Sequence, residues 1–385
     1  MLPCFADQGS PSRPVRVLRA ADFAAWEAGA AAPVRAWLAG SGFAAKAGAV
    51  ALLPGAEAPA ALLLVGDPAE PWDAAALQAA LPPGDWRLDD PDALLPAHLA
   101  ALCWALAAYR FTRYRRDERV APRLVLPDGA AGVLRPRTIA AATWRARDLI
   151  NTPANDLGPE ELAEAIRSVG AGHGAECRIV VGDALLAANY PAVHAVGRAS
   201  ARAPRLIDLR WGEAAAPRLT LVGKGVCFDS GGLDLKTSAN MLLMKKDMGG
   251  AAVMLALAEC VMALGLPVRL RLLVPAVENL VGSAAFRPGD VLTMRSGTTV
   301  EITNTDAEGR LILADALADA DAETPALLLD AATLTGAARV ALGPELAALF
   351  TPDDRLADAL VAAGGANLDP LWRLPLHAPY RGYLK

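Results

Sequence analysis

The sequence has few of the residues on which most zinc proteases and disulfide-rich proteins depend. Its four histidines include no pair at HExxH spacing, which argues against a histidine-based zinc protease. Its five cysteines are scattered and form no CxxC pair, a pattern typical of free thiols in a reducing compartment. A GxSxG elbow, a GxxxxGK[ST] loop and a GxGxxG fingerprint are also absent, so three common enzyme and nucleotide-binding classes lack support.

Aromatic residues make up only 5% of the chain, so its core is expected to be aliphatic. Basic residues number 37 and acidic residues 42, and a net charge of -5 provides no general argument for nucleic-acid binding. The first residues lack a basic start followed by an apolar stretch, so no secretory signal is predicted. The most apolar window, Met248–Val268, contains Glu259 and several glycines, which favours a buried helix over a membrane span. We expect a cytoplasmic protein without membrane association.

The 385 residues are enough for two or three domains. Turn residues Pro127, Asp128, Gly129 and Gly132 mark a break. We therefore predict an N-terminal α/β domain over residues 1–130, a linker helix over 131–150 and a catalytic domain over 151–385. In the first domain the pattern predicts helices and strands in the following order: helix Ala21–Ala28, strands Ala47–Leu53 and Ala60–Gly66, and helix Ala97–Tyr109. The bridging helix is expected at Thr138–Ile150.

Apolar runs of strand length alternate with helical patterns in the third region. The predicted strands are Cys177–Val181, Arg205–Leu209, Leu219–Val222, Val268–Ala276, Thr299–Ile302 and Ala326–Asp330. The predicted helices are Pro159–Ser168, Gly249–Leu264 and Leu311–Ala320. This alternation is typical of an α/β domain with a mainly parallel central sheet that helices cover on both faces.

Charged residues follow the buried strand at Leu219–Val222, where glycines interrupt the apolar run. Lys224 and Asp229 lie just beyond this run, and the carboxyl ends of strands are where α/β sheets form their sites. A buried lysine or aspartate is costly unless it is paired or bound to a metal. The alternative is a salt bridge within the turn. These two residues alone do not decide between a functional site and a salt bridge.

Three further charged positions have a functional and a plain interpretation. Asp306 and Glu308 are two residues apart, so on an extended chain both carboxylates point the same way and can bind one or two hard cations. Near a helix start they can instead only favour the helix dipole. Asp247 opens the apolar helix and can be its N-cap, and Lys236 lies in a polar loop where a surface lysine is the plain interpretation.

Three segments taken together resemble the leucyl (cytosol) aminopeptidase family of two-metal aminopeptidases. They are VGKGVCFDSGGLDLK, MLLMKKDMGGAA and NTDAEGRLILADAL, and their order and spacing agree with the family, as does DAATLTGA at 330–337. The resemblance begins near Ala146–Pro159 and runs to the end of the chain. It is much less specific in the first 130 residues, which are similar to the family's variable N-terminal domain.

The resemblance implies a role for each matching position. Lys224, Asp229, Asp247 and Glu308 match the ligands of a tightly held metal ion, and Asp229, Asp306 and Glu308 those of an exchangeable one. Lys236 and Arg310 match the two catalytic residues that are not ligands, with Arg310 holding a bicarbonate that acts as general base. Met244, Thr333 and Gly336 match part of the pocket for the first side chain of the substrate.

The implied reaction releases N-terminal residues, leucine and similar ones, from peptides with a free N-terminus. Two divalent ions activate water, and Lys236 stabilises the charge that develops on the scissile carbonyl. The ligand set has no histidine or cysteine, and we favour Mn²⁺ or Zn²⁺ among the ions that it accepts. Lys224 must be neutral to bind a metal, so metal coordination and burial are expected to lower its pKa strongly.

The resemblance also implies a homohexamer, but the chain ends at Lys385, which resembles a point before the end of the family's catalytic domain. A catalytically inactive homologue is one alternative to an active, assembled enzyme. A preference for particular dipeptides such as cysteinylglycine is another. Some relatives bind DNA, and Tyr109–Arg123 is rich in arginine. We favour a solvated helix end there, leading into a strand at Leu124–Leu126, with arginines paired to Asp117 and Glu118.

Overall fold

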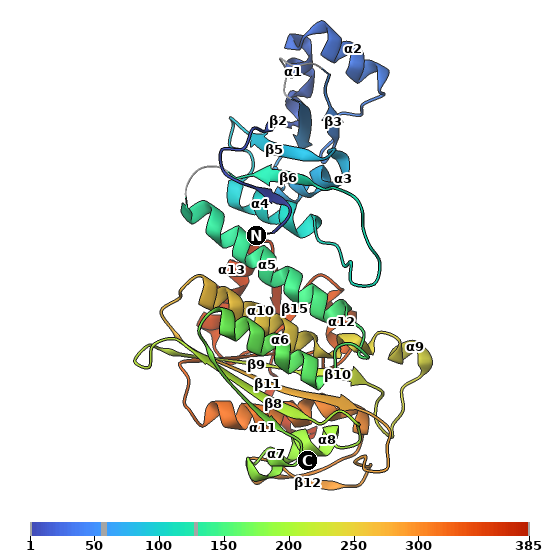
Figure 1. Cartoon of the computed structure of the whole chain (residues 1–385), viewed down its shortest axis with the longest axis vertical. Coiled ribbons are helices and arrows are strands. Elements are labelled where there is room, and N and C mark those ends of the chain that lie inside the picture. The colour runs from blue at the N-terminus through green and yellow to red at the C-terminus, as the bar shows by residue number, and fades with distance from the viewer. Residues whose placement is uncertain (1, 55–59, 127–129, 384–385) are drawn as a thin grey trace. The chain divides into compact units, whose positions relative to one another are not determined.

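The computed structural model describes residues 2–54, 60–126 and 130–383, and the side chains of residues 130–133 lie outside this description. The predicted break at Pro127–Gly129 falls outside the described residues. The chain divides into two compact units, Met1–Thr333 and Leu334–Lys385. The first unit contains two six-stranded sheets that are flanked by helices (Figure 1), so the predicted α/β fold class is confirmed.

The N-terminal sheet has six strands in the order β1-β6-β5-β2-β4-β3. All neighbouring pairs are parallel except β3 with β4. The strands are β1 (Phe5–Ala6), β2 (Arg13–Arg19), β3 (Val50–Leu52), β4 (Ala61–Val65), β5 (Gly84–Asp89) and β6 (Pro122–Val125). The helices are η1 (Ala20–Asp22), α1 (Phe23–Gly29), α2 (Ala32–Gly40), η2 (Pro71–Ala76), α3 (Leu77–Ala80) and α4 (Ala97–Ala107). The predicted helices and strands of this region are confirmed with shifted ends, since β3 is shorter than predicted and α4 ends earlier.

The long helix α5 (Ala130–Asn151) follows the first sheet and packs against both α4 and α10 (Gly249–Ala263). Two of its side chains make the connections: Trp144 donates a hydrogen bond to the carbonyl of Ala105, and Arg145 pairs with Glu259 at 2.8 Å. The helix therefore belongs to the core of both regions, as the predicted bridging helix requires.

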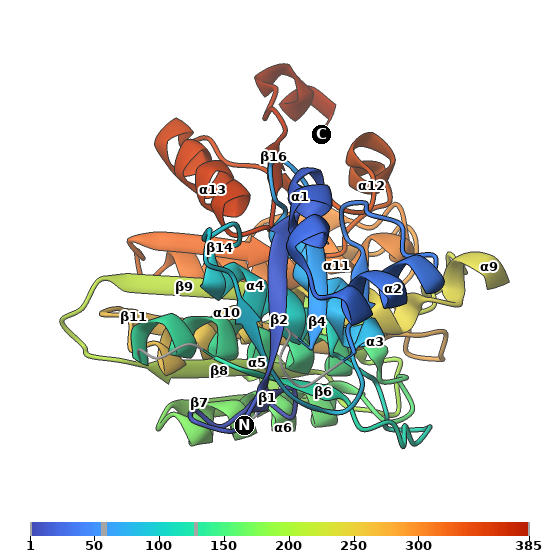
Figure 2. The same ribbon diagram turned by 90° about the horizontal axis from the view of Figure 1, so that it is seen from above.

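The second sheet has the order β14-β9-β11-β8-β7, with β10 also pairing with β11. Its strands are β7 (Glu176–Val181), β8 (Arg205–Trp211), β9 (Arg218–Gly223), β10 (Gly225–Asp229), β11 (Arg269–Asn279) and β14 (Leu327–Ala331). Figure 2 shows the strands of this sheet beside one another in this order. Pairs among β14, β9, β11 and β10 are parallel, whereas β8 pairs antiparallel with both β11 and β7. The sheet is mixed, and its parallel part carries the charged strand ends.

Helices cover both faces of this sheet, as predicted. In Figure 1, α6 (Pro159–Gly172) and α10 lie on one face, and α8 (Pro191–Gly197) and α11 (Glu308–Asp321) lie on the other. Side chains along β11 alternate between the two cores: Leu272 and Val274 face α6 and α10, and Leu273 and Val277 face α8 and α11. The predicted buried helix in the most apolar window is α10, and among the described residues no helix is long and apolar enough to cross a bilayer.

The remaining elements of the first unit are short. They are α7 (Ala184–Ala187), α9 (Ser238–Met241), η3 (Met244–Met248), β12 (Val291–Thr293), β13 (Thr299–Glu301) and η4 (Thr305–Ala307). The second unit contains α12 (Ala337–Leu342), β15 (Ala347–Leu349), α13 (Asp354–Ala366), β16 (Leu371–Arg373) and η5 (Ala378–Tyr383). Within this unit β15 and β16 pair in parallel, and Asp353 caps α13 by accepting from two backbone N–H groups.

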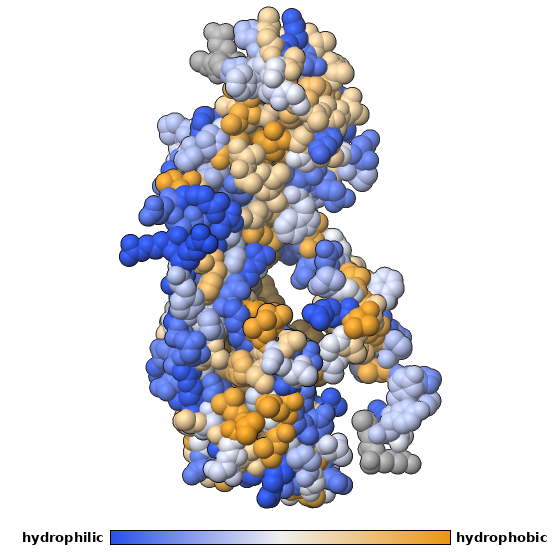
Figure 3. All heavy atoms as spheres, turned by 90° about the vertical axis from the view of Figure 1, so that its right-hand side faces the viewer, coloured by the Kyte–Doolittle hydropathy of each residue, from blue (hydrophilic) through white to orange (hydrophobic). Residues whose placement is uncertain are grey.

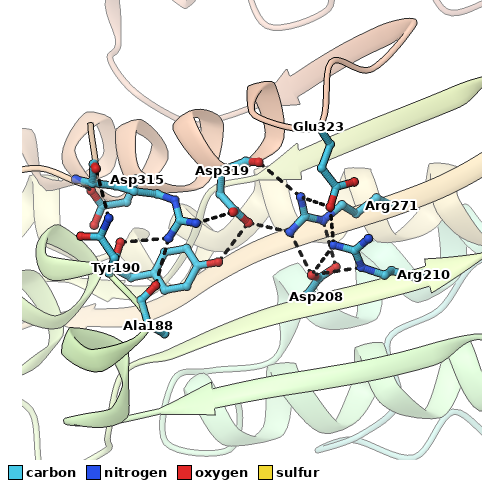
Figure 4. A network of polar contacts seen from close by, with 10 residues as sticks. Ala188, Tyr190, Asp208, Arg210, Arg271, Asp315, Asp319 and Glu323 are labelled. Carbon is cyan, nitrogen blue, oxygen red and sulfur yellow. Dashed lines mark hydrogen bonds and ion pairs between the residues drawn. The ribbon is translucent and has the colours of Figure 1, made fainter. Parts of the chain in front are cut away.

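An ion-pair network fastens α11 to the sheet (Figure 4). Asp319 of α11 accepts from Arg271 of β11 at 2.5 Å and from Arg295 at 2.5 Å. Arg271 also pairs with Asp208 of β8 at 2.9 Å, and Tyr190 donates to Asp319 at 3.0 Å. These contacts join β8, β11 and α11, and so they hold the helix whose first residue is Glu308.

The arginine-rich segment between α4 and β6 lies at the surface. Asp117 pairs with Arg119 at 2.7 Å and with Arg110 at 3.9 Å, as expected. Over the described ranges no ion pair joins Glu118 to these arginines, so that part of the expectation is wrong. Hydrophilic and hydrophobic residues are interspersed on the face of the molecule drawn in Figure 3.

Candidate metal centre and active site

Lys224 occupies the short break between β9 and β10. Its backbone N–H donates to Ala331 of β14 at 3.0 Å, and its carbonyl accepts from Ala251 of α10 at 2.9 Å. Both bonds fix the backbone, and the side chain is only 2% exposed. The sequence pattern did not predict β10. Asp229 is the last residue of this second buried strand.

The amine of Lys224 lies between two carboxylates from distant parts of the chain. Its Nζ is 2.8 Å from Asp247 Oδ2 and 3.0 Å from Glu308 Oε1, and both carboxylates are 2% exposed. Gly309 makes this approach possible, since a Cβ there would lie 2.4 Å from Lys224 Cε. The alternative of a local salt bridge between Lys224 and Asp229 is therefore wrong.

A second lysine faces the other half of the cluster. Lys236 Nζ is 2.8 Å from Asp229 Oδ2 and forms an ion pair with Asp306 Oδ1. Its side chain is 12% exposed, so the interpretation as a surface lysine is wrong. The loop that returns Lys236 to the site turns at Gly231, where φ is +88°, a conformation that favours glycine.

Three of the carboxylates form one compact group. Asp229, Asp306 and Glu308 each offer an oxygen within 4.8 Å of the others. Asp306 lies in η4 and Glu308 begins α11, so the prediction of an extended chain at this pair is wrong. Asp247 lies in η3 and α10 is capped by Met248, so the interpretation of Asp247 as the cap of α10 is also wrong.

Burial raises the pKa of three carboxyl groups in this cluster, Asp247, Asp306 and Glu308. The pKa of Glu308 rises to about 7, first because the group is desolvated, and then because Asp229 and Asp247 are negatively charged neighbours. The pKa values of Asp247 and Asp306 are also raised, chiefly by burial, although a lysine opposes the shift in each case. Ionising all of these neighbouring carboxyl groups is therefore unfavourable unless further positive charge is present.

The pKa values of two lysines in the cluster are raised as well, but here by charge and against the effect of burial. Burial on its own would lower the pKa of Lys224, but the charges of Glu308 and Asp247 outweigh it, and the pKa is raised. The pKa of Lys236 is raised well above its ordinary value for the same reason, with Asp229 and Asp306 as the partners. The protein groups by themselves hold the amine protonated, and the lowering of the Lys224 pKa that is expected on metal coordination stays a prediction.

The remaining predicted residues lie in different surroundings. Thr333 donates from Oγ1 to Asp247 Oδ1 at 2.8 Å, and Met244 begins the short helix η3 that contains Asp247. Arg310 is exposed, and among the described residues no carboxylate pairs with its guanidinium. Gly336 belongs to the second unit, as the residue before α12.

Comparisons with known protein families identify the family of this chain. Residues 144–385 match the catalytic domain of the cytosol aminopeptidase family, and residues 13–127 match the N-terminal domain of M17 aminopeptidases. The chain belongs to the cytosol aminopeptidase family.

Individual relatives of this cytosol aminopeptidase family show the extent of the similarity. A probable cytosol aminopeptidase of Syntrophotalea carbinolica is 44% identical over 73% of this chain and 59% of its own length. The crystal structure of a cytosol aminopeptidase from Coxiella burnetii has a TM-score of 0.93 and 47% identity, over 99% of this chain and 84% of that one. The bottromycin maturation enzyme BotP in complex with Mn has a TM-score of 0.85 and 38% identity, over 97% and 84% of the two chains. The chain thus spans less than two thirds of the length of the first of these relatives.

Sequence reasoning missed one polar residue at the centre of the cluster. Asn279 ends β11, is 1% exposed and donates a hydrogen bond to Asp229. The available signal was the polar pair Glu278-Asn279 at the end of a long apolar strand. The other missed residue, Gly309, is recognisable only once the path of Lys224 is known.

Proposed function

We propose that this chain is a metal-dependent aminopeptidase that releases leucine and similar N-terminal residues from peptides. The observation that carries the proposal is the buried cluster of four carboxylates. Two largely buried lysines contact it closely, and a third, the 40% exposed Lys246, comes only within 3.7 Å of Asp247. Two of its carboxylate oxygens, Asp247 Oδ2 and Asp306 Oδ1, are buried, and each has a lysine amine at ion-pair distance but no well-aligned hydrogen bond. A group of this kind is what a hard divalent cation satisfies.

The residues that would hold two ions follow from this cluster. Lys224, Asp229, Asp247 and Glu308 would hold one, and Asp229, Asp306 and Glu308 the other. Bound divalent ions lower the pKa of water to about 7 and polarise a carbonyl oxygen. An oxygen-rich donor set accepts Mn²⁺ or Zn²⁺, and the Mn-bound state of BotP supports Mn²⁺.

Lys236 would act as a catalytic residue that stabilises negative charge. Its ammonium group lies at the edge of the cluster, partly exposed, and its raised pKa keeps it protonated at neutral pH. It can therefore donate a hydrogen bond to the carbonyl oxygen of the scissile peptide as that oxygen becomes negative. Loss of one such donor typically costs about 100- to 1000-fold in rate.

Arg310 would hold the bicarbonate that moves a proton from water to the leaving amine. Because its guanidinium is exposed and has no carboxylate partner in the described part of the chain, it is available to an anion. The planar fork of arginine matches a planar anion through two parallel hydrogen bonds, which lysine cannot reproduce.

The specificity pocket and the organisation of the chain belong to the same proposal. Met244, Thr333 and Gly336 would contact the first side chain of the substrate. The proposed organisation is an N-terminal domain over residues 1–130, a linker helix over 131–150 and a catalytic domain from 151. The family matches to residues 13–127 and 144–385 support a boundary in this region. A cytoplasmic homohexamer is the form in which we expect the enzyme to work.

Hydrolysis of leucine p-nitroanilide tests the function directly. The chain is preincubated with Mn²⁺ and compared with an EDTA-treated sample and with an N-acetylated substrate. Hydrolysis that requires both the metal and a free amine supports an aminopeptidase. A folded, Mn²⁺-loaded chain without hydrolysis would refute the proposed activity and favour a non-catalytic homologue.

A further inference from the structure

Asn279 lies at the centre of the carboxylate cluster without being one of the proposed ligands. It is the last residue of β11 and pairs in parallel register with Asp229, the last residue of β10. Its backbone carbonyl accepts from both the N–H and the hydroxyl of Ser230, at 2.9 and 2.8 Å. The backbone is thus fixed on both sides, and the side chain points among the carboxylates.

The amide nitrogen of Asn279 connects three segments of the chain. It donates to Asp229 Oδ1 at 2.9 Å and to the carbonyl of Thr305 at 3.0 Å, with Glu308 Oε2 more distant at 3.4 Å. The amide has only two hydrogens, so Glu308 receives the weakest share. All three neighbours are acceptors, and this fixes which end of the amide is nitrogen.

These contacts determine which oxygen of each carboxylate faces a lysine and which faces the amide of Asn279. Asp229 Oδ1 accepts from Asn279 and from the backbone N–H of Gly231 at 2.9 Å, which leaves Oδ2 directed toward Lys236. Glu308 places Oε2 near the amide and Oε1 against Lys224. One neutral side chain therefore orients both of the carboxylates that would bridge the two ions.

Neutrality is the property that suits asparagine to this position. A lysine or arginine would orient the same oxygens but would also supply the positive charge that a divalent cation brings. The amide donates without cancelling the charge, so the cluster keeps its excess of carboxylates. Orientation of ligands by such outer hydrogen bonds commonly accounts for about 10- to 100-fold in metal affinity.

We propose that Asn279 is a positioning residue that orients Asp229 and Glu308 for two divalent ions. This proposal rests on the proposed metal-dependent function. What it adds is that Asn279 acts by donating hydrogen bonds from its amide. The size of the side chain and its effect on the stability of the fold do not account for this role.

Calorimetric titration of the EDTA-stripped full chain with MnCl₂ tests this role. The variants are Asn279→Leu, which keeps a similar volume without a donor, and Asn279→Ser, which is smaller and easier to accommodate. Tyr190→Phe is the matched control, since it removes a buried hydrogen bond to Asp319 in the same domain, outside the cluster. Circular dichroism and thermal unfolding without metal establish that each variant is folded.

We expect both Asn279 variants to bind Mn²⁺ about 10- to 100-fold more weakly, while Tyr190→Phe keeps the affinity of the unaltered chain. Unchanged affinity in a folded Asn279 variant overturns the positioning role alone. Equal weakening by Tyr190→Phe also overturns it, because the effect would then reflect general stability. Failure of the unaltered chain to bind Mn²⁺ overturns both this role and the proposed function.

Discussion

Two buried polar groups in the catalytic domain differ in how their charges are compensated. In the network of Figure 4, Arg210, Arg271 and Arg295 supply guanidinium groups to Asp208, Asp319 and Glu323. In the candidate metal centre, three lysines face four carboxylates, and one of the three, Lys246, is 40% exposed and lies 3.7 Å from Asp247. Among the described residues, buried carboxylate oxygens without a well-aligned hydrogen bond occur in the second group and not in the first, and a lysine amine at ion-pair distance is what each of them has instead.

This difference separates a structural device from a binding site. Guanidinium groups satisfy several carboxylate oxygens at once, so the network is complete within the protein. The metal centre has few donors for its carboxylates, and desolvation raises the pKa of Asp247, Asp306 and Glu308, that of Glu308 to about 7. A buried polar cluster that its own side chains leave incomplete is the better candidate for binding a cation.

The largest expected effect comes from removing a bridging carboxylate. In Asp229→Ala or Glu308→Ala, each proposed ion loses a ligand, so we expect no detectable Mn²⁺ binding and no hydrolysis. Metal content after dialysis and turnover of leucine p-nitroanilide are the measurements. Full activity in either variant would contradict the two-metal assignment. A Tyr190→Phe chain that is purified and dialysed in parallel is the control for loss of metal during preparation.

Breaking the arginine network should affect stability and leave the metal centre intact. Asp319→Ala leaves Arg271 and Arg295 without a shared partner, and loss of a buried ion-pair partner costs about 3–5 kcal/mol. Urea denaturation provides the free energy of unfolding, and Mn²⁺ titration of the folded chain provides the affinity. The surface control is Glu160→Ala, whose carboxylate is 72% exposed and whose loss should cost less than about 1 kcal/mol. If the Asp319→Ala chain were as stable as the control, the claim that the arginine network stabilises the fold would be contradicted.

Lys236→Ala separates metal binding from catalysis within the centre. The side chain is a proposed donor to the developing oxyanion, so kcat/KM should fall by about 100- to 1000-fold. Mn²⁺ affinity should be retained, because Lys236 is not a proposed ligand. Loss of the metal together with activity would instead make Lys236 part of the metal-binding set.

The smallest effect expected is a dependence of Mn²⁺ affinity on pH. Glu308 has a pKa raised to about 7 and Lys224 a raised pKa, so both hold protons that a metal ion must displace. Affinity should therefore rise with pH, by about tenfold per pH unit for each proton released. Titrations at pH 6.5, 7.5 and 8.5 in non-chelating buffers measure this slope. A flat profile would show that neither group exchanges a proton with the metal.

Much of this site was predictable because its residues lie in short, unusual segments. Lys224 and Asp229 directly follow buried strand residues, and Asp306 and Glu308 lie between a strand and a helix. Their grouping across the chain came from the family resemblance, since each pattern alone had a plain interpretation. The same patterns could not reveal β10 as a strand or the helical backbone at Asp306, because a few residues carry no periodicity.

The sequence by itself determined the family, the alternation of strands and helices, and the identity of the proposed ligands. Only the tertiary structure decided that Lys224 pairs with Asp247 and Glu308, that Asn279 donates to Asp229, and that Asp319 fastens α11 to the sheet. The physical reason is that a buried charge or amide must find its partner within about 3 Å. Partners so distant in sequence are brought together by the packing of strands and helices, which no local pattern encodes.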